Sequence, residues 1–259
     1  MGTIILHMPL WLSIILVAGT AAGFVTILLV LVRKIFRYEN LKHNNEVAGF
    51  MIAVLGAIYS VMLAFMILTV YDEFKEGRNT TSNETASIIE LYRFSEGFTV
   101  PFGEKIRKSL IAYADSVVVD EWPCMEHGVE SAKTMIAMNT IWKIYLQYSP
   151  ANTRESVIYT QSIALLDDLR SARQNRILSS KTLIPGIMWF VLISGAMITV
   201  AFSFFFGSPN MNAQIGMTAL LAVTISLLLL LLVQLDNPFF GPVSIDNELF
   251  RGILIEMRG

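Results

Sequence analysis

Residues 47–71 read VAGFMIAVLGAIYSVMLAFMILTVY, and this stretch decides the fold class. It contains no Asp, Glu, Lys or Arg, and it exceeds the roughly 20 residues that a helix needs to cross a hydrocarbon core about 30 Å thick. Three further stretches have the same character, at residues 10–32, 183–206 and 213–235. The sequence therefore predicts an all-α membrane protein with four transmembrane helices in two hairpins.

The composition agrees with this class. Hydrophobic residues make up 54% of the chain and charged residues 15%, against about 25% charged residues in ordinary soluble domains. The net charge is −2 and no basic stripe is visible, so nucleic acid is excluded as a partner. The first apolar stretch is expected to be retained rather than cleaved, because it is longer than a signal-peptide core and no Lys or Arg precedes it.

The region between the two hairpins has a different character. Charges of both signs are interspersed there, and apolar residues recur at helical spacing, which predicts amphipathic helices near 73–98, 103–120, 125–148 and 152–179. The predicted organisation is a first transmembrane hairpin (1–71), a soluble helical domain (72–182), a second hairpin (183–235) and a C-terminal tail (236–259).

Recognisable catalytic patterns are missing from the sequence. It contains no metalloprotease His pair, no nucleotide-binding glycine loop and no Gly-x-Ser-x-Gly elbow. The chain is therefore not expected to be an enzyme. The span interiors also lack charged residues, which usually mark proton and ion relays, so a proton-coupled transporter is disfavoured.

The second span carries a stripe of small residues. Gly49, Ala53, Gly56, Ser60 and Ala64 fall within about a quarter of the helix circumference at 100° per residue. Such a stripe allows another helix backbone to approach closely. It also suits a helix that faces a pore axis, and since four helices are too few to enclose a channel, that pore would need several subunits.

The exit of the fourth span is rich in oxygen-bearing side chains. Asp236 and Asn237 end the span, and Asp246 and Glu248 follow shortly after it. Asn and Pro are good helix stops, so one interpretation is purely structural. The other is an ion-binding loop, for which calcium is the candidate because carboxylate and carbonyl oxygens are its ligands. The loop has no EF-hand pattern, and no other cofactor is expected.

The basic residues near the span ends do not settle the membrane orientation. Arg33, Lys34, Arg37 and Lys42 lie in the first connection, which favours a cytoplasmic position for it. More basic residues lie near the opposite ends of the spans, namely Lys75, Arg78, Arg170, Arg173, Arg176, Lys181 and Arg251. Residues in long loops count for less in this rule, so both orientations stay open.

Several short motifs resemble the bestrophin-like membrane proteins, a family named after the bestrophin channels. Val54-Leu55-Gly56 with Tyr59 is similar to the bestrophin pore helix, and Asn237-Pro238-Phe239 is similar to the stretch leading into the bestrophin calcium clasp. The other residues that carry the resemblance are Tyr113, Glu121-Trp122-Pro123, Arg170 through Arg176, Pro185, Trp189, Gly241, Asp246 and Phe250.

Bestrophins are pentameric ion channels with four spans per subunit and a large cytosolic helical region. The resemblance implies a homo-oligomer, with a pentamer favoured, in a plasma or bacterial inner membrane, with the bilayer and small ions as partners. It places the soluble domain and the termini in the cytoplasm.

The resemblance also implies that the second span lines the axis and adds Ala57 to the pore-lining set. The bulky neck positions of bestrophins fall on Gly49, Ala53 and Ala57, which are small here, and the acidic run of the calcium clasp is reduced to Asp246 and Glu248.

Two functions follow as hypotheses. The first is an oligomeric, bestrophin-like ion channel or channel-like protein with the second span at its axis. The alternative is a non-conducting membrane scaffold or sensor, in which the helical domain binds a partner or ligand and the spans serve as an anchor.

Overall fold

The computed structural model describes residues 6–35, 45–181 and 184–259, and all regular secondary structure in these ranges is helical. Arg37 and Lys42, which enter the orientation argument, lie outside the described residues. The helices are α2 (Leu10–Ile35), α4 (Asn45–Phe94), η1 (Ser95–Gly97), α5 (Val100–Ser116), η2 (Val117–Glu121), α6 (Trp122–Met125), α7 (Ala132–Leu146), α8 (Thr153–Ser179), α9 (Gly186–Ser203), α10 (Met211–Leu235) and α11 (Glu248–Arg258).

Four of these helices are long and apolar enough to cross a membrane, namely α2, α4, α9 and α10. This confirms the predicted number and position of the spans. The prediction of a separate helix at 73–98 is wrong at its start, because α4 runs without a break from Asn45 to Phe94. Asp72, Glu73 and Lys75 at the predicted junction are compatible with a helix, and no proline interrupts it.

The chain forms two compact units. The membrane unit comprises Met1–Asp72, Leu183–Asp236 and Gly241–Val243, and the soluble unit comprises Glu73–Thr182, Asn237–Phe240 and Ser244–Gly259. Both hairpins thus belong to one unit, and most of the tail joins the soluble unit. Helix α4 contributes its first part to the membrane unit and the remainder to the soluble unit.

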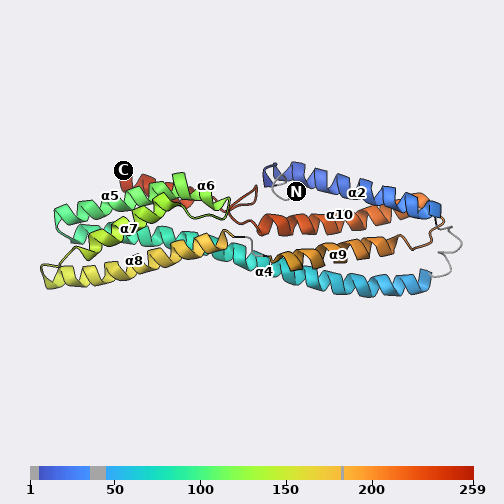
Figure 1. Ribbon diagram of the computed structural model, residues 1–259, viewed down its shortest axis with the longest axis horizontal. Coiled ribbons are helices and arrows are strands. Elements are labelled where there is room, and N and C mark those ends of the chain that lie inside the picture. Colours follow the sequence, from blue (N-terminus) through green and yellow to red (C-terminus); the bar gives the residue numbers. More distant parts are fainter. Residues whose placement is uncertain (1–5, 36–44, 182–183) are drawn as a thin grey trace. The chain divides into compact units, whose positions relative to one another are not determined.

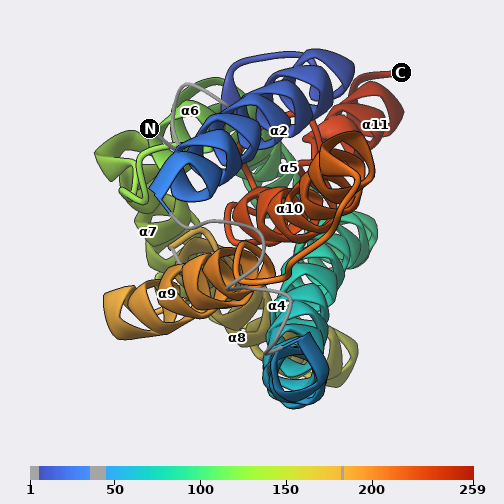
Figure 2. The same ribbon diagram turned by 90° about the vertical axis from the view of Figure 1, so that its right-hand side faces the viewer.

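Within the membrane unit, α2 lies along α10 in both views (Figures 1 and 2). Val25 and Leu29 of α2 pack with Ala222 of α10 and with Phe204. The first part of α4 packs on α9, where the Tyr59 ring contacts the backbone at Gly195. Spans from different hairpins are therefore in direct contact, which ties the two hairpins into one bundle.

Polar side chains bond the connection between α9 and α10 at one end of this bundle. The Asn45 side chain donates to the carbonyl of Gly207 and accepts from its N–H, both at 2.8 Å. Arg33 donates to the Ser208 carbonyl at 2.9 Å and also to the side chain of Gln214. Backbone groups near hydrocarbon must be hydrogen-bonded within the protein, because water is not available to them. The Asn45 and Arg33 side chains bond the backbone groups of Gly207 and Ser208 in this way.

In the soluble unit, α5, α7 and α8 are grouped with the later part of α4 (Figure 1). Its core contains Ile88 from α4, Leu110 from α5, Ile141 from α7 and Leu169 from α8. Helix α11 adds an apolar face to the same core, made by Phe250, Ile253, Leu254 and Met257. Side-chain caps begin two of the helices, since Ser131 accepts from Thr134 N and Asn152 accepts from Glu155 N.

We expect Gly195→Ala to loosen the packing of α9 on α4. A Cβ at this position would lie 2.8 Å from a ring carbon of Tyr59, and overpacking of this kind costs about 1–3 kcal/mol. The measurement is the thermal unfolding midpoint of the detergent-solubilised protein. Gly216→Ala in α10 is the control, because a Cβ there meets nothing within 4 Å, and an equal midpoint for the two variants would contradict the packing argument.

Candidate functional site

The small-residue stripe of α4 is mostly uncovered by the other spans of the membrane unit. Ala53, Ala57, Ser60 and Ala64 are exposed, and Gly49 and Gly56 are partly buried. The side of this segment that packs inward carries different residues, among them Tyr59, Leu63 and Val70, which are at most 6% exposed. Most of the stripe is therefore left uncovered by the described residues of this chain, apart from the contacts described next.

Three stripe residues line a groove. Gly56, Ser60 and Ala64 border a cavity of about 310 Å³, together with Thr199 of α9 and residues of α10. The hydroxyl groups of Ser60 and Thr199 donate to carbonyls of their own helices, at 2.9 and 2.8 Å. The surface that remains is neutral and mainly apolar, so it offers no specific ligands to an ion.

Asp236 at the exit of α10 has a structural role. Its carboxylate is buried, with 4% of the residue exposed, and it accepts from Ile184 N at 2.9 Å and from Trp189 Nε1 at 3.3 Å. These donors lie just before α9 and in its first turn. A carboxylate at a helix N-terminus is stabilised by the unpaired N–H groups and the helix dipole, so Asp236 fastens α9 to the end of α10.

The other predicted ion-binding residues belong to the soluble unit. Asn237 accepts from Phe240 N through its carbonyl, which closes a turn, and the Asp246 side chain accepts from Glu248 N at 3.1 Å. Asp246 and Glu248 are exposed and border a cavity of about 310 Å³ that the side chain of Arg78 also lines. Among the described residues, no group of three or more His, Cys, Asp or Glu side chains is placed to hold a metal ion.

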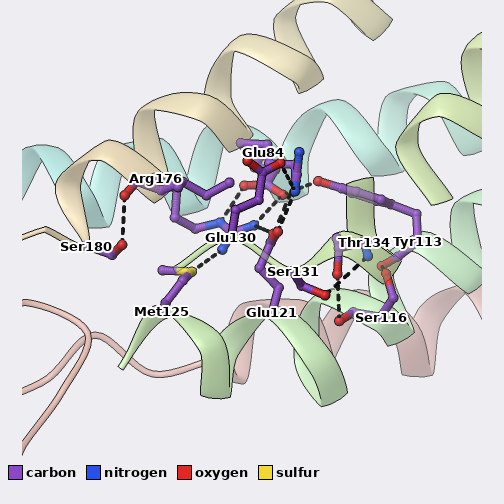
Figure 3. A network of polar contacts seen from close by, with 12 residues as sticks. Glu84, Tyr113, Ser116, Glu121, Met125, Glu130, Ser131, Thr134, Arg176 and Ser180 are labelled. Carbon is purple, nitrogen blue, oxygen red and sulfur yellow. Dashed lines mark hydrogen bonds and ion pairs between the residues drawn. The ribbon is translucent and has the colours of Figure 1, made fainter. Parts of the chain in front are cut away.

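The soluble unit contains a buried ion-pair network centred on Arg176 (Figure 3). Arg176 has no exposed surface. Its Nε and Nη2 contact the two oxygens of Glu84 at 2.6 and 3.0 Å, and Nη2 also contacts Glu121 at 2.7 Å. The Tyr113 hydroxyl donates to Glu84 at 2.6 Å, so Glu84 is bonded on both oxygens.

A second arginine completes the network. Arg173, one turn before Arg176 on α8, contacts Glu121 at 2.5 Å and the half-exposed Glu130 at 2.9 Å. Two guanidinium groups thus face the two fully buried carboxylates, and Glu130 closes the cluster at its edge. Buried charges are tolerated when they are paired and hydrogen-bonded in this way.

Local backbone structure brings Glu121 into the core. The residue ends η2, a π-helical turn over Val117–Glu121, and α6 begins at the next residue, Trp122. A π-turn rotates the following side chains relative to an α-helix, and such turns often occur where a particular side chain must be placed. The Arg176 guanidinium also lies over the rings of Trp122 and Phe250, at 5.4 and 5.5 Å from their centroids.

The electrostatics of the network keep Arg176 charged. Burial by itself would lower the pKa of Arg176, but the facing carboxylates of Glu84 and Glu121 outweigh it and raise this pKa. Burial and the Glu84 charge raise the pKa of Tyr113 well above its usual value, so its hydroxyl stays a donor. Arg176 and Tyr113 therefore do not exchange protons near neutral pH.

Sequence reasoning did not identify this network as a site. It connected Glu121 and the Arg170–Arg176 segment only through the family resemblance, and it gave Glu84 no role. A usable signal was present, because Arg173 and Arg176 share the face of α8 that carries the buried Leu166, Leu169 and Ile177. Arginine on an otherwise apolar helix face requires a buried carboxylate partner.

Four apolar spans and a helical soluble unit define the class as a multi-pass, all-α membrane protein. A family model described as the bestrophin-like domain matches residues 19–250. The chain belongs to the bestrophin-like family, which confirms the resemblance drawn from its motifs. A comparison with curated proteins gave no match.

Solved structures have the same fold. A bacterial bestrophin homologue from Klebsiella pneumoniae with a leucine-to-threonine mutation superimposes with a TM-score of 0.73 at 14% identity, covering 95% of this chain and 99% of that chain. A tyrosine-to-alanine variant of the bestrophin homologue from the same organism gives 0.71 at 15% identity, covering 95% and 98%. A membrane protein with a proline-to-alanine mutation gives 0.69 at 16% identity, covering 92% and 98%.

We expect Arg176→Gln to destabilise the soluble unit strongly, because it leaves Glu84 and Glu121 buried without Arg176 as their shared partner. Removing one partner of a buried ion pair costs about 3–5 kcal/mol, which corresponds to roughly 10 °C in the unfolding midpoint of a chain of this size. The measurement is thermal unfolding followed by tryptophan fluorescence, because Trp122 stacks on Arg176.

Arg170→Gln is the matched control for that variant. Arg170 lies on α8 but is exposed, and surface substitutions usually change stability by no more than about 0.5 kcal/mol. If both variants unfolded at the same temperature, the Arg176 network would not be a main support of the fold.

Proposed function

We propose that the protein is a homo-oligomeric ion channel in which the first part of α4 lines the axis. The supporting observation is a small, neutral face, most of which the other spans of the membrane unit leave exposed; it is made by Gly49, Ala53, Gly56, Ala57, Ser60 and Ala64. A helix that packed only within its own subunit would be expected to bury such a face. A pore helix, by contrast, needs a small-residue face that stays uncovered after the subunit has folded.

The side chains on this face determine how such a pore would behave. Rings of bulky apolar side chains close channels by excluding water, and alanine and glycine rings are too small to do this at a comparable backbone radius. We therefore propose a wide neck that hydrated ions can pass without losing their water.

Charge selection in this proposal takes place at the ends of the span. The interior of the span carries no charge, whereas Glu46 near the start of α4 and Asp72 at the end of its membrane part are both exposed. In an oligomer, these carboxylates would repeat around the axis, and rings of carboxylates favour cations.

Assembly and location complete the proposal. Membership of the bestrophin-like family favours a pentamer, with the soluble unit and the termini in the cytoplasm of a cell that carries the protein in its plasma or bacterial inner membrane. Calcium enters only as a candidate regulator at Asp246 and Glu248.

The alternative is a non-conducting scaffold or sensor. The observation in its favour is that small-residue faces also permit close packing of helices, so a neighbouring subunit or another membrane protein would seal the stripe. The soluble unit would then be the part that receives a partner or ligand.

Conductance of the purified protein in planar bilayers tests the proposal. We expect wild-type protein to conduct and Ala53→Phe to reduce the current at least severalfold, because the larger side chain narrows the neck. Ala201→Phe makes the same change at an exposed position of α9 and is expected to leave the current near the wild-type level.

Two results would reject the channel. One is a monomer in mild detergent, since four spans cannot enclose a pore. The other is the absence of current over a range of voltage, pH and calcium concentration, which would favour the scaffold. A current that responds to calcium, and no longer responds in Asp246→Asn with Glu248→Gln, would assign the regulatory role to the tail.

A further inference from the structure

A cavity of about 310 Å³ lies between α4, α9 and α10 in the membrane unit, and we call it the mid-span cavity. Its volume lies in the range of small-molecule sites. No Asp, Glu, Lys, Arg or His is among the residues that line it, so a charged ligand would lose its hydration there without gaining a counter-ion. Most of the wall is aliphatic, with side chains from Leu63, Ile67, Leu221, Ile225 and Leu228. The cavity therefore favours an uncharged, lipophilic molecule.

The depth of the cavity excludes the polar part of a phospholipid. Tyr59, which also lines the cavity, is the middle residue of the apolar stretch 47–71. It lies about 18 Å from either end of this stretch at 1.5 Å per residue, and half of the hydrocarbon core is only about 15 Å thick. Ester and head groups at the membrane surface do not reach this level. A polar atom that enters the cavity must therefore belong to a molecule that dissolves in the hydrocarbon itself.

An unpaired hydroxyl group indicates that such a ligand carries a polar atom. Tyr59 packs on α9 at Gly195 and is only 6% exposed. Its hydroxyl group has no hydrogen-bond partner in the part of the chain that the structure describes. A buried hydroxyl without a partner costs free energy, and within a span no water is available to replace the missing partner. An oxygen atom of a ligand in the adjoining cavity would supply it.

The other hydroxyl groups of the cavity are already used as donors. Ser60, Thr199 and Thr224 donate to carbonyls of their own helices, at 2.9, 2.8 and 2.9 Å. Of the hydroxyl groups that line the cavity, only that of Tyr59 lacks an acceptor. A ligand with one acceptor oxygen and no O–H or N–H group complements this single donor, because it brings no unpaired donor of its own. A carbonyl group is the simplest group of this kind.

We propose that the mid-span cavity binds an uncharged, lipophilic carbonyl compound, either a compact ketone or the head group of a quinone. Its hydrocarbon part packs on Leu63, Ile225 and Leu228, and its oxygen accepts a hydrogen bond from Tyr59. Neighbouring side chains cover the hydroxyl oxygen, so the tyrosine side chain shifts toward the ligand as it binds. All lining residues belong to one chain, so binding can be tested separately from conduction.

Photolabelling of the full-length protein in lipid vesicles tests the site. Benzophenone is a lipophilic ketone that reacts with nearby C–H bonds when it is irradiated, and peptide mass spectrometry then locates the label. We expect saturable labelling of the parts of α4 and α10 that line the cavity. Fluorenone should suppress this labelling at about three- to tenfold lower concentration than fluorene, which has a similar shape but no oxygen, because one neutral hydrogen bond contributes a factor of this size.

Tyr59→Phe removes the hydroxyl group and keeps the ring. We expect it to weaken competition by fluorenone about three- to tenfold and to leave competition by fluorene unchanged. The unfolding midpoint should not fall, because the variant removes a buried group that has no partner. Tyr71→Phe is the matched control, since it removes a hydroxyl group from an exposed position outside the cavity, and it should leave both competitors within about twofold of wild type.

Three results would overturn the proposal. Equal competition by fluorenone and fluorene in the wild-type protein would show that the cavity takes any hydrocarbon, such as a lipid tail. Unchanged competition by fluorenone in Tyr59→Phe would show that the hydroxyl group does not contact the ligand. Absence of label from α4 and α10 would show that the cavity is closed in the membrane, for example by a second copy of the chain.

Decylubiquinone distinguishes the two sources of the carbonyl group. Competition by it at concentrations similar to those of fluorenone would assign the site to a quinone head group. Competition by fluorenone alone would assign it to a compact ketone.

Discussion

The burial of the Arg176 charge is the constraint on which the soluble unit depends. A guanidinium with no exposed surface requires carboxylates in fixed positions, and Glu84 and Glu121 supply them from α4 and from the end of η2. Three segments far apart in the sequence must therefore meet at the guanidinium. The π-turn directly before Trp122 places Glu121 in this network, and the Trp122 and Phe250 rings lie against the guanidinium.

The two parts of α4 meet different physical demands. In the membrane unit, the helix has large exposed apolar side chains and an inward face limited to a few residues, which suits contact with lipid. In the soluble unit, its inward face carries Ile88, Leu91 and the paired Glu84, all without exposed surface. One continuous helix can belong to both units because helix formation needs only backbone hydrogen bonds. The side chains differ between its two parts and match the surroundings of each.

The spans could be predicted because each is a continuous run of apolar residues that is visible in the sequence itself. The continuity of α4 was harder to predict. The composition changes from apolar to charged at Asp72, which resembles a domain boundary, although the helix continues through it. The Arg176 network was not predicted because Glu84 and Arg176 are 92 positions apart in the sequence. A local sequence pattern does not reveal a contact over such a separation. The bonds of Asp236 to Ile184 and Trp189 were not predicted, because these donors come from the start of another helix.

The absence of charge along the span interiors becomes informative when it is combined with the small stripe of α4. A charged side chain at the centre of a span costs about 2.5–3.5 kcal/mol, and a narrow path would need such a group, or a ring of carbonyls, to replace the water that an ion loses. A neutral wall of glycine, alanine and serine provides neither. It is compatible with ion passage only when the path is wide enough for the ion to keep its water, and a path of that width requires several subunits around the axis.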